Sequence, residues 1–168
     1  MKIDLKKFSN QYDIRILKKE DIDSIYELCS ENKMFYQYHP PFVTRESILE
    51  DMQALPPGKT ENDKYYVGYF DEKILVSVLD LILEYPNEET VYIGFFMVNK
   101  LFQNKGLGTL MIEECAQYLK ESGFEKLRLA IDQGNPQSEA FWKKNKFQKT
   151  GDVVQNEFLA YVPMERTL

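Results

Sequence analysis

The residues best suited to chemistry form one short stretch, Gln103-Asn104-Lys105-Gly106-Leu107-Gly108-Thr109. It follows an apolar segment and precedes apolar residues at helical spacing. Glycines at a strand-to-helix junction let the backbone approach a ligand closely, because no Cβ intervenes. The first turn of a helix offers free N–H groups and the positive end of the helix dipole. The stretch therefore predicts a phosphate or pyrophosphate site, to which Lys105 adds positive charge.

The alternative interpretation of Gly106 and Gly108 is an ordinary strand-to-helix turn, since a Gly-x-Gly pair is common. Two other phosphate-binding motifs are absent. The chain has no third glycine for a dinucleotide fingerprint and no Gly-Lys-Ser/Thr for a P-loop.

The elements before this loop are predicted from periodicity and turn residues. Alternation predicts a strand over residues 12–17, and a helix follows with Ile22, Ile25, Tyr26 and Cys29 on its apolar face. The aromatic segment 35–42 contains Pro40 and Pro41, which forbid a continued helix. Thr44 is the expected N-cap of a second helix, which Pro56-Pro57-Gly58 stops. Strands over residues 65–70, 74–83 and 90–98 are joined as antiparallel hairpins.

After the loop, the spacing of apolar residues predicts a helix from Leu107 to Ser122-Gly123, followed by a strand over residues 126–131. A strand, helix and strand in this order imply a parallel crossover. Asn135-Pro136 opens another helix, and extended structure resumes at Phe147 and ends with residues 157–163. The sequence thus predicts one α/β domain over residues 1–168, with residues 1–10 loosely ordered and a mostly antiparallel sheet containing one crossover.

Composition narrows the class of protein. The 168 residues are 43% hydrophobic and carry a formal net charge of −6, which suits one domain with a buried core. The chain shows no basic face for nucleic acid, whereas its acidity suits a small cationic acceptor. No signal segment and no membrane-length apolar run occur, which predicts a cytoplasmic protein. Cys29 and Cys115 match no metal spacing, so buried thiols and no metal are expected.

Two motifs together resemble the GNAT superfamily of N-acetyltransferases. Residues 103–108 match its Q/R-x-x-G-x-G/A loop. Residues 135–147, Asn-Pro-Gln-Ser-Glu-Ala-Phe-Trp-Lys-Lys-Asn-Lys-Phe, resemble its N-x-x-A-x-x-x-Y-x-K-x-G-F stretch. The likeness spans roughly Tyr12 to the C-terminus. It implies transfer of an acetyl group from acetyl-CoA, as cosubstrate, to an amine by direct attack in a ternary complex.

The resemblance also implies which residues bind the cofactor. The backbone of Met97 and Val98 is expected to pair with the pantetheine arm, where a bulge splays their strand from residues 127–131. Amides of residues 104–109 are expected to hold the pyrophosphate. Asn135 is expected to bind the cofactor's amide or carbonyl groups, to cap the helix at Pro136, or to do both. The full implied set is Met97, Val98, Gln103, Asn104, Lys105, Gly106, Leu107, Gly108, Thr109, Asn135, Ser138 and Trp142.

The chain departs from the family pattern at Trp142 and Lys146. Many relatives place at the position of Trp142 a tyrosine that protonates the leaving thiolate, and an indole N–H cannot act as that acid. Lys146 replaces the usual glycine, which suggests a tolerated turn conformation. No glutamate occupies the middle of strand 90–98, where some relatives keep one. Asp80, inside an apolar strand, and Glu84, at its end, are the candidate general bases; a salt bridge for Asp80 and a solvated Glu84 are the alternatives.

The acceptor wall is expected in the aromatic segment 35–42. Tyr36, Tyr38 and the only histidine, His39, are the candidate residues that shape a pocket or bind a cation with their ring faces. A packed loop anchored by prolines is the alternative.

Three functions remain open at this stage. The leading one is an acetyl-CoA-dependent N-acetyltransferase acting on a small-molecule amine or on a peptide or protein amine, with neither nucleic acid nor membrane as partner. The second, which Trp142 favours, is an acyl-CoA-binding regulatory or degenerate module without turnover. The third is an interaction domain that has lost cofactor binding, which the intact loop argues against. A homodimer is left open.

Overall fold

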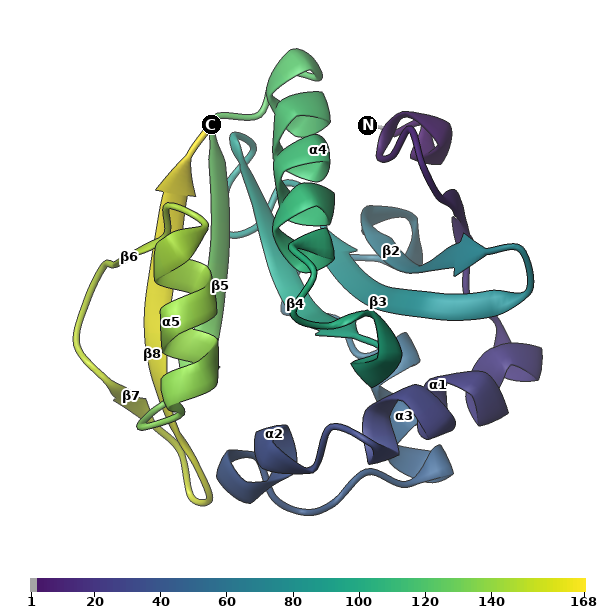
Figure 1. Ribbon diagram of the computed structural model, residues 1–168. Helices are drawn as coiled ribbons and strands as arrows, with labels where there is room; N and C mark the ends of the chain where they lie inside the picture. Colours follow the sequence, from purple (N-terminus) through teal and green to yellow (C-terminus); the bar gives the residue numbers. More distant parts are fainter. Residues whose placement is uncertain (1–2) are drawn as a thin grey trace.

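Eight strands form one mixed sheet in the computed structural model, which describes residues 3–168 (Figure 1). The strands are β1 (Asp13–Ile16), β2 (Lys64–Asp71), β3 (Ile74–Ile82), β4 (Thr90–Val98), β5 (Lys126–Asp132), β6 (Gln148–Lys149), β7 (Val154–Gln155) and β8 (Ala160–Thr167). The helices are α1 (Ile22–Ser30), α2 (Lys33–Tyr38), α3 (Arg45–Gln53), α4 (Leu107–Glu121) and α5 (Pro136–Lys144), with 3-10 turns at Leu5–Lys7, Lys19–Asp21, Glu61–Asp63 and Lys100–Phe102.

The sheet has the order β1-β2-β3-β4-β5-β8-β6, and β7 also pairs with β8. Every pair is antiparallel except β4 and β5, which α4 connects. This confirms the predicted fold class, a mostly antiparallel sheet with one parallel crossover. Figure 1 shows α4 and α5 in front of the sheet and α1, α2 and α3 grouped at its lower end.

Two hydrophobic clusters pack against the sheet, and β3 contributes side chains to both. The larger contains Val76 and Leu79 of β3 with the buried stripe of α4, from Met111 to Leu119. The smaller contains Leu75 and Val78 with buried residues of α1 and α3. Because successive strand residues point to opposite faces, the middle of β3 is enclosed on both sides. Any polar residue in that strand therefore needs a partner.

Helix caps explain where two helices begin. The Thr44 hydroxyl accepts a hydrogen bond from the Ser47 N–H at 3.0 Å, which caps α3 as predicted. The Asn135 side chain accepts from the N–H groups of Gln137 and Ser138, and Pro136 occupies the first position of α5. Cys29 and Cys115 are free and buried, also as predicted.

The structure corrects two predicted element boundaries. The aromatic segment begins inside a helix, α2, because the prolines exclude helical backbone only from the residue before Pro40 onward. The predicted final strand over residues 157–163 is wrong, since β8 runs from Ala160 to Thr167. Pro163 does not end that strand; it pairs opposite Ala130, and its carbonyl accepts from the Thr150 N–H.

Candidate active site

A bulge in β4 opens the sheet beside β5. Asp80 pairs with Phe95 and the next residue, Leu81, pairs with Ile93, so Gly94 is the extra residue. β4 pairs with β5 only over Thr90–Tyr92 and Lys126–Arg128. The expected bulge is therefore present, and the splay begins after Arg128. Beyond that point the edge of β4 that faces β5 has no strand partner, which leaves backbone groups for an extended ligand.

Asp80 lies directly over this bulge. A Cβ atom at position 94 would lie 2.5 Å from the Asp80 Oδ2 atom, so any larger residue there would displace the Asp80 carboxylate. The same oxygen accepts a hydrogen bond from Lys64 Nζ at 2.8 Å, and both side chains are buried. The Oδ1 atom is buried without a partner. Burial raises the pKa of the Asp80 carboxyl to about 6, although Lys64 opposes that change.

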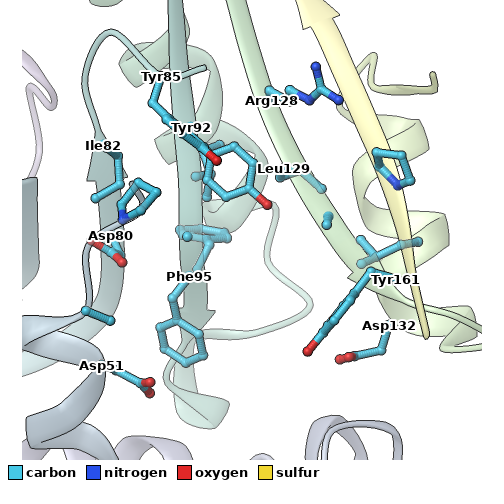
Figure 2. Close-up of a pocket in the computed structure, with 18 of the residues that line it drawn as sticks. Asp51, Asp80, Ile82, Tyr85, Tyr92, Phe95, Arg128, Leu129, Asp132 and Tyr161 are labelled. Carbon is cyan, nitrogen blue, oxygen red and sulfur yellow. The ribbon is translucent and has the colours of Figure 1, made fainter. Parts of the chain in front are cut away.

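A large cavity extends from this carboxylate across the splayed strands. It has a volume of about 890 Å³ and is lined by residues of α2, α3, β2–β5, α5, β7 and β8. Figure 2 shows Asp80 and Asp51 on one side of Phe95 and Asp132 on the other. Phe95, Phe96 and Trp142 contribute apolar surface, while Tyr92 and Tyr161 contribute hydroxyl groups. An apolar cavity with a few convergent charged groups is typical of a small-molecule site.

His39 joins the two walls of the cavity. Its Nδ1 atom lies 2.9 Å from Asp132 Oδ1 at the end of β5, and its ring stacks on Phe35 at 5.2 Å. The hydrogen bond to the buried Asp132 carboxylate raises the pKa of His39, which favours the imidazolium. His39 and Tyr36 both line the cavity, as expected of an acceptor wall, whereas Tyr38 does not.

The predicted phosphate loop has the backbone that the sequence suggests. Asn104 and Gly106 have φ values of 60° and 75°, and α4 begins at Leu107 with its free first-turn N–H groups. A Cβ at Gly108 would lie 3.2 Å from Phe141, so the helix packs closely on α5. Lys105 is exposed, and its Nζ atom donates to the Leu101 carbonyl.

Gln103 ties the loop to two other segments. Its Nε2 atom donates to the Val98 carbonyl at 2.8 Å and to Asn32 Oδ1 at 2.6 Å. The Asn32 side chain in turn donates to Leu28 and Val98 carbonyls. The glutamine side chain therefore fixes the end of β4 against the α1–α2 connection, which sequence reasoning did not foresee.

Asn135 and Trp142, two residues of the predicted cofactor set, offer different groups to a ligand. Asn135 caps α5 through Oδ1, while its Nδ2 atom is buried without a partner and is free to donate to a carbonyl. Trp142 is 8% exposed, lines the cavity and packs on Phe96, Phe141 and Phe147. These observations fit the amide-rich pantetheine arm of coenzyme A: a spare donor on one side and an aromatic wall on the other.

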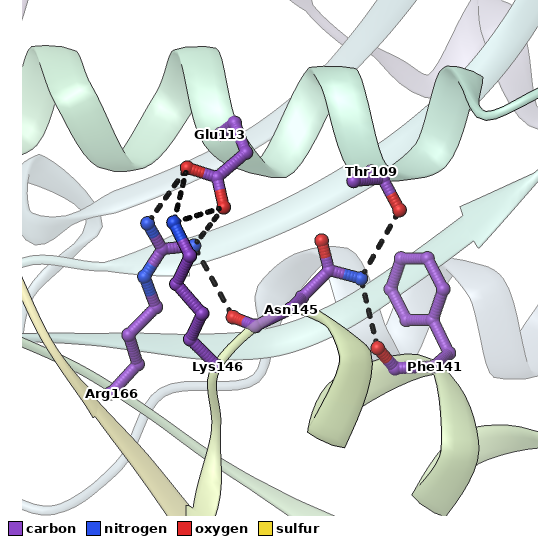
Figure 3. Close-up of polar contacts among 6 residues, drawn as sticks. All are labelled: Thr109, Glu113, Phe141, Asn145, Lys146 and Arg166. Atoms are coloured by element: carbon purple, nitrogen blue, oxygen red, sulfur yellow. Dashed lines mark hydrogen bonds and ion pairs between the residues drawn. The ribbon is translucent and has the colours of Figure 1, made fainter.

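A polar network around the buried Asn145 and Arg166 connects α4 to the end of α5 and to β8 (Figure 3). Asn145 Nδ2 donates to Thr109 Oγ1 at 3.4 Å, and the Asn145 carbonyl accepts from Arg166. Arg166 also forms a bidentate pair with Glu113 on α4. Lys146, with φ at 71°, reaches the same Glu113, so the residue that replaces glycine adopts the left-handed backbone that glycine favours.

Some site residues escaped sequence reasoning. Gly94, Lys64, Asp51 and Asp132 all belong to the cavity, and a lone glycine or charge within an element gave no spacing signal. Glu84, a candidate base, does not line the cavity.

Within residues 3–168 no cluster of histidine, cysteine or carboxylate side chains could hold a metal ion. No helix in the same range is long and apolar enough to cross a membrane.

Comparison with known proteins identifies the class to which this fold and site belong. The model of the acetyltransferase (GNAT) family matches residues 22–147, three quarters of the chain. The chain belongs to the GNAT acetyltransferase family.

Solved structures share the fold at low sequence identity. An acetyltransferase from Thermus thermophilus is 21% identical, with a TM-score of 0.74, 94% of this chain covered and 97% of that one. The paia N-acetyltransferase from Thermoplasma acidophilum, in complex with coenzyme A, is 18% identical with a TM-score of 0.66, covering 94% and 99%. Spermidine N-acetyltransferase from Vibrio cholerae, in complex with CoA and spermine, is 15% identical with a TM-score of 0.67, covering 95% and 96%.

Proposed function

We propose that the chain is an N-acetyltransferase that moves an acetyl group from acetyl-CoA to an amine acceptor in a ternary complex. One observation carries this proposal: the unpaired edge of β4 beyond the Gly94 bulge borders the cavity into which the buried Asp80 carboxylate faces. A thioester held along that edge would present its carbonyl carbon to an acceptor in the cavity. The family match, and a solved N-acetyltransferase of the same fold in complex with coenzyme A, support this choice of donor.

The cofactor residues are proposed as the sequence implied them. Backbone amides of residues 104–109 would bind the pyrophosphate at the start of α4. Met97 and Val98 would offer backbone groups to the pantetheine arm; the Val98 carbonyl already accepts from Gln103, so its N–H is the better candidate. Asn135 Nδ2 would donate to a pantetheine carbonyl, and Ser138 and Trp142 would line the same slot.

The transfer needs one proton acceptor for the amine. An acceptor ammonium would give a proton to the Asp80 carboxylate, whose pKa of about 6 suits a base near neutral pH. The neutral nitrogen would then attack the thioester carbon, the carbon–sulfur bond would break, and the CoA thiolate would leave and take up the second amine proton, by way of solvent. Glu84 is the weaker candidate because it lies outside the cavity. The products are an N-acetyl amine and CoA.

Calorimetry with acetyl-CoA, followed by an assay for free CoA over a panel of amines, tests the proposal. Gly106→Val should abolish most binding, because a β-branched residue is strained at φ 75° and covers the anion site. Gly123→Val introduces comparable strain at φ 97°, at the far end of α4, and should keep binding. No binding by the wild type at millimolar acetyl-CoA would contradict the assignment.

Trp142 supports a second candidate function. Its indole replaces a side chain that protonates the thiolate in many relatives, so a module that binds acyl-CoA without turnover remains the competing proposal. Binding of acetyl-CoA without CoA release for any amine would favour it.

A further inference from the structure

Asp51 is the carboxylate of the cavity wall that has no charged partner. It lies on α3 and lines both the main cavity and a recess of about 110 Å³ beside it. Across residues 3–168 no hydrogen bond or ion pair joins Asp51 to another side chain. The two other carboxylates of the cavity differ, because Asp80 pairs with Lys64 and Asp132 pairs with His39.

The charge of Asp51 influences the pKa values of other groups in the cavity. Asp51 is exposed to solvent as a whole residue, but partial loss of hydration raises the pKa of its carboxyl, an effect that the more distant charges of His39 and Lys64 only reduce. Asp51 also contributes to the raised pKa values of Asp80 and Tyr66. Two mutually repelling carboxylates thus line one cavity, and the Oδ1 atom of Asp80 is buried without a hydrogen-bond partner. A cation bound between them would relieve the repulsion.

Two aromatic rings line the same cavity and recess as Asp51. Tyr36 and Phe95 line both the main cavity and the recess, together with Asp51. Phe35 packs edge-on against both rings, at 5.0 Å from Tyr36 and 6.0 Å from Phe95, which holds them in place. A carboxylate beside aromatic faces is the chemistry that binds an alkylammonium group.

We propose that Asp51, with the rings of Tyr36 and Phe95, is a subsite for a second cationic group of the acceptor, and that the acceptor is therefore an aliphatic diamine or a similar dication. The inference rests on the proposed function, since the reacting amine lies at Asp80 over Gly94 while the other end lies at Asp51. Asp80 and Asp132 already have Lys64 and His39 as partners, so Asp51 is the carboxylate of the cavity that is left for a second positive charge of the acceptor.

The cavity wall opposite Asp51 favours a different class of acceptor, one that carries a carboxylate. Arg128 of β5 lines the cavity near Tyr92, and within residues 3–168 its guanidinium forms no ion pair. An acceptor with one amine and one carboxylate would use Arg128 instead of Asp51. Length-matched acceptors separate the two: 1,5-diaminopentane carries a second cation, 5-aminopentanoate a carboxylate, and pentylamine neither.

The test measures kcat/KM for the three acceptors with wild type, Asp51→Asn and Glu50→Gln. Wild type should prefer the diamine over pentylamine by about tenfold or more, the effect of one charge-assisted contact with ring faces. Asp51→Asn should bring that ratio close to one. Glu50→Gln removes the same charge from the exposed neighbouring residue outside the cavity, and should keep the ratio. A preference for 5-aminopentanoate, or a diamine preference that survives Asp51→Asn, would overturn the proposal.

A binding measurement separates this inference from the proposed chemistry. Calorimetry of 1,5-diaminopentane against the protein saturated with CoA should give tighter binding than pentylamine in wild type but not in Asp51→Asn. If that difference appears without any CoA release from acetyl-CoA, the transferase proposal fails and the subsite stands. Equal binding of both amines to wild type would contradict the subsite even in an active enzyme.

Discussion

Asp80 Oδ2 lies so close to Gly94 that a Cβ atom at position 94 would stand 2.5 Å away from it. The contact joins the bulge of β4 to the buried Asp80–Lys64 pair on the neighbouring strands. A carboxylate from β3 thus occupies the space that a side chain on β4 would otherwise fill. The absence of a side chain at Gly94 therefore lets the Asp80 carboxylate, the proposed base, lie directly against the bulge of β4.

Gly94→Ala tests that coupling. The added methyl group must push the Asp80 carboxylate away from its place beside Lys64, so we expect a loss of stability of about 1–3 kcal/mol and a clear fall in kcat. Urea unfolding and steady-state kinetics measure the two effects. Gly151→Ala is the matched control, because its Cβ would meet only Pro163 at an ordinary 3.8 Å. Unchanged activity in Gly94→Ala would show that the position of Asp80 is not needed for transfer.

Asp80→Asn tests the base itself. Because the carboxylate form is active, kcat/KM should rise with pH through about 6, the pKa of Asp80 in the free enzyme, and the variant should lose that limb and at least ~100-fold in kcat. The variant also leaves Lys64 buried without its anion, which costs stability. The double variant Lys64→Met/Asp80→Asn removes the stranded charge and should regain stability while kcat stays low. Activity that returns with stability would mean that Asp80 is structural.

The His39–Asp132 pair predicts a separate pH effect on stability. Asp132 raises the pKa of His39, so the pair contributes fully below the ordinary value of 6.5 and loses its contribution as pH rises through the raised value. Because His39 is partly exposed, the change should stay below about 1 kcal/mol. The unfolding free energies of wild type and His39→Gln, measured from below pH 6.5 to above the raised pKa of His39, should become equal at the high-pH end. Parallel curves would show that the pair is not populated in solution.

Lys105→Glu tests the charge beside the phosphate loop. Lys105 is exposed, and its Nζ atom donates to the Leu101 carbonyl and lies 5.9 Å from the centre of the Phe102 ring, so it has no anionic partner among the described residues and remains available to a bound anion. The variant should weaken CoA about fivefold to tenfold, and weaken a phosphate-free pantetheine fragment much less, because the lost attraction is electrostatic. Lys100→Glu makes the same charge change at an exposed residue before the loop. Equal losses for CoA and for the fragment would exclude a phosphate contact by Lys105.

The sequence predicted the fold and the strand-to-helix loop at Gly106 better than the residues of the cavity, for physical reasons. The order of elements follows from apolar periodicity, and the backbone at Gly106 follows from glycine at a strand-to-helix junction. Asp51 and Asp132 have no such local signal, since residues so far apart in the chain line one cavity only in the folded protein. The pairing of Asp80 with Lys64 likewise depends on the register of β2 against β3, which alternation alone does not fix.

Trp142 distinguishes an enzyme with another proton route from a binding module. The indole is buried against Phe96, Phe141 and Phe147 and lines the cavity, so its surface is placed to contact the pantetheine arm. Trp142→Phe keeps an aromatic ring but removes area, and should raise the apparent KM for acetyl-CoA about fivefold with kcat nearly unchanged. A comparable fall in kcat would instead assign the indole a role in the chemical step.

Trp142→Tyr is the sharper variant, because it restores the hydroxyl that many relatives carry. If transfer relies on Asp80 and on a thiolate that leaves without a side-chain acid, this variant should gain no more than about twofold in kcat, since the site is not built around a donor there. Trp142→Phe serves as its control for the loss of indole area. Stopped-time assays of CoA release with the best acceptor measure all three proteins. A Trp142→Tyr protein that turns over where the wild type does not would mean that the natural chain binds acyl-CoA without transferring it.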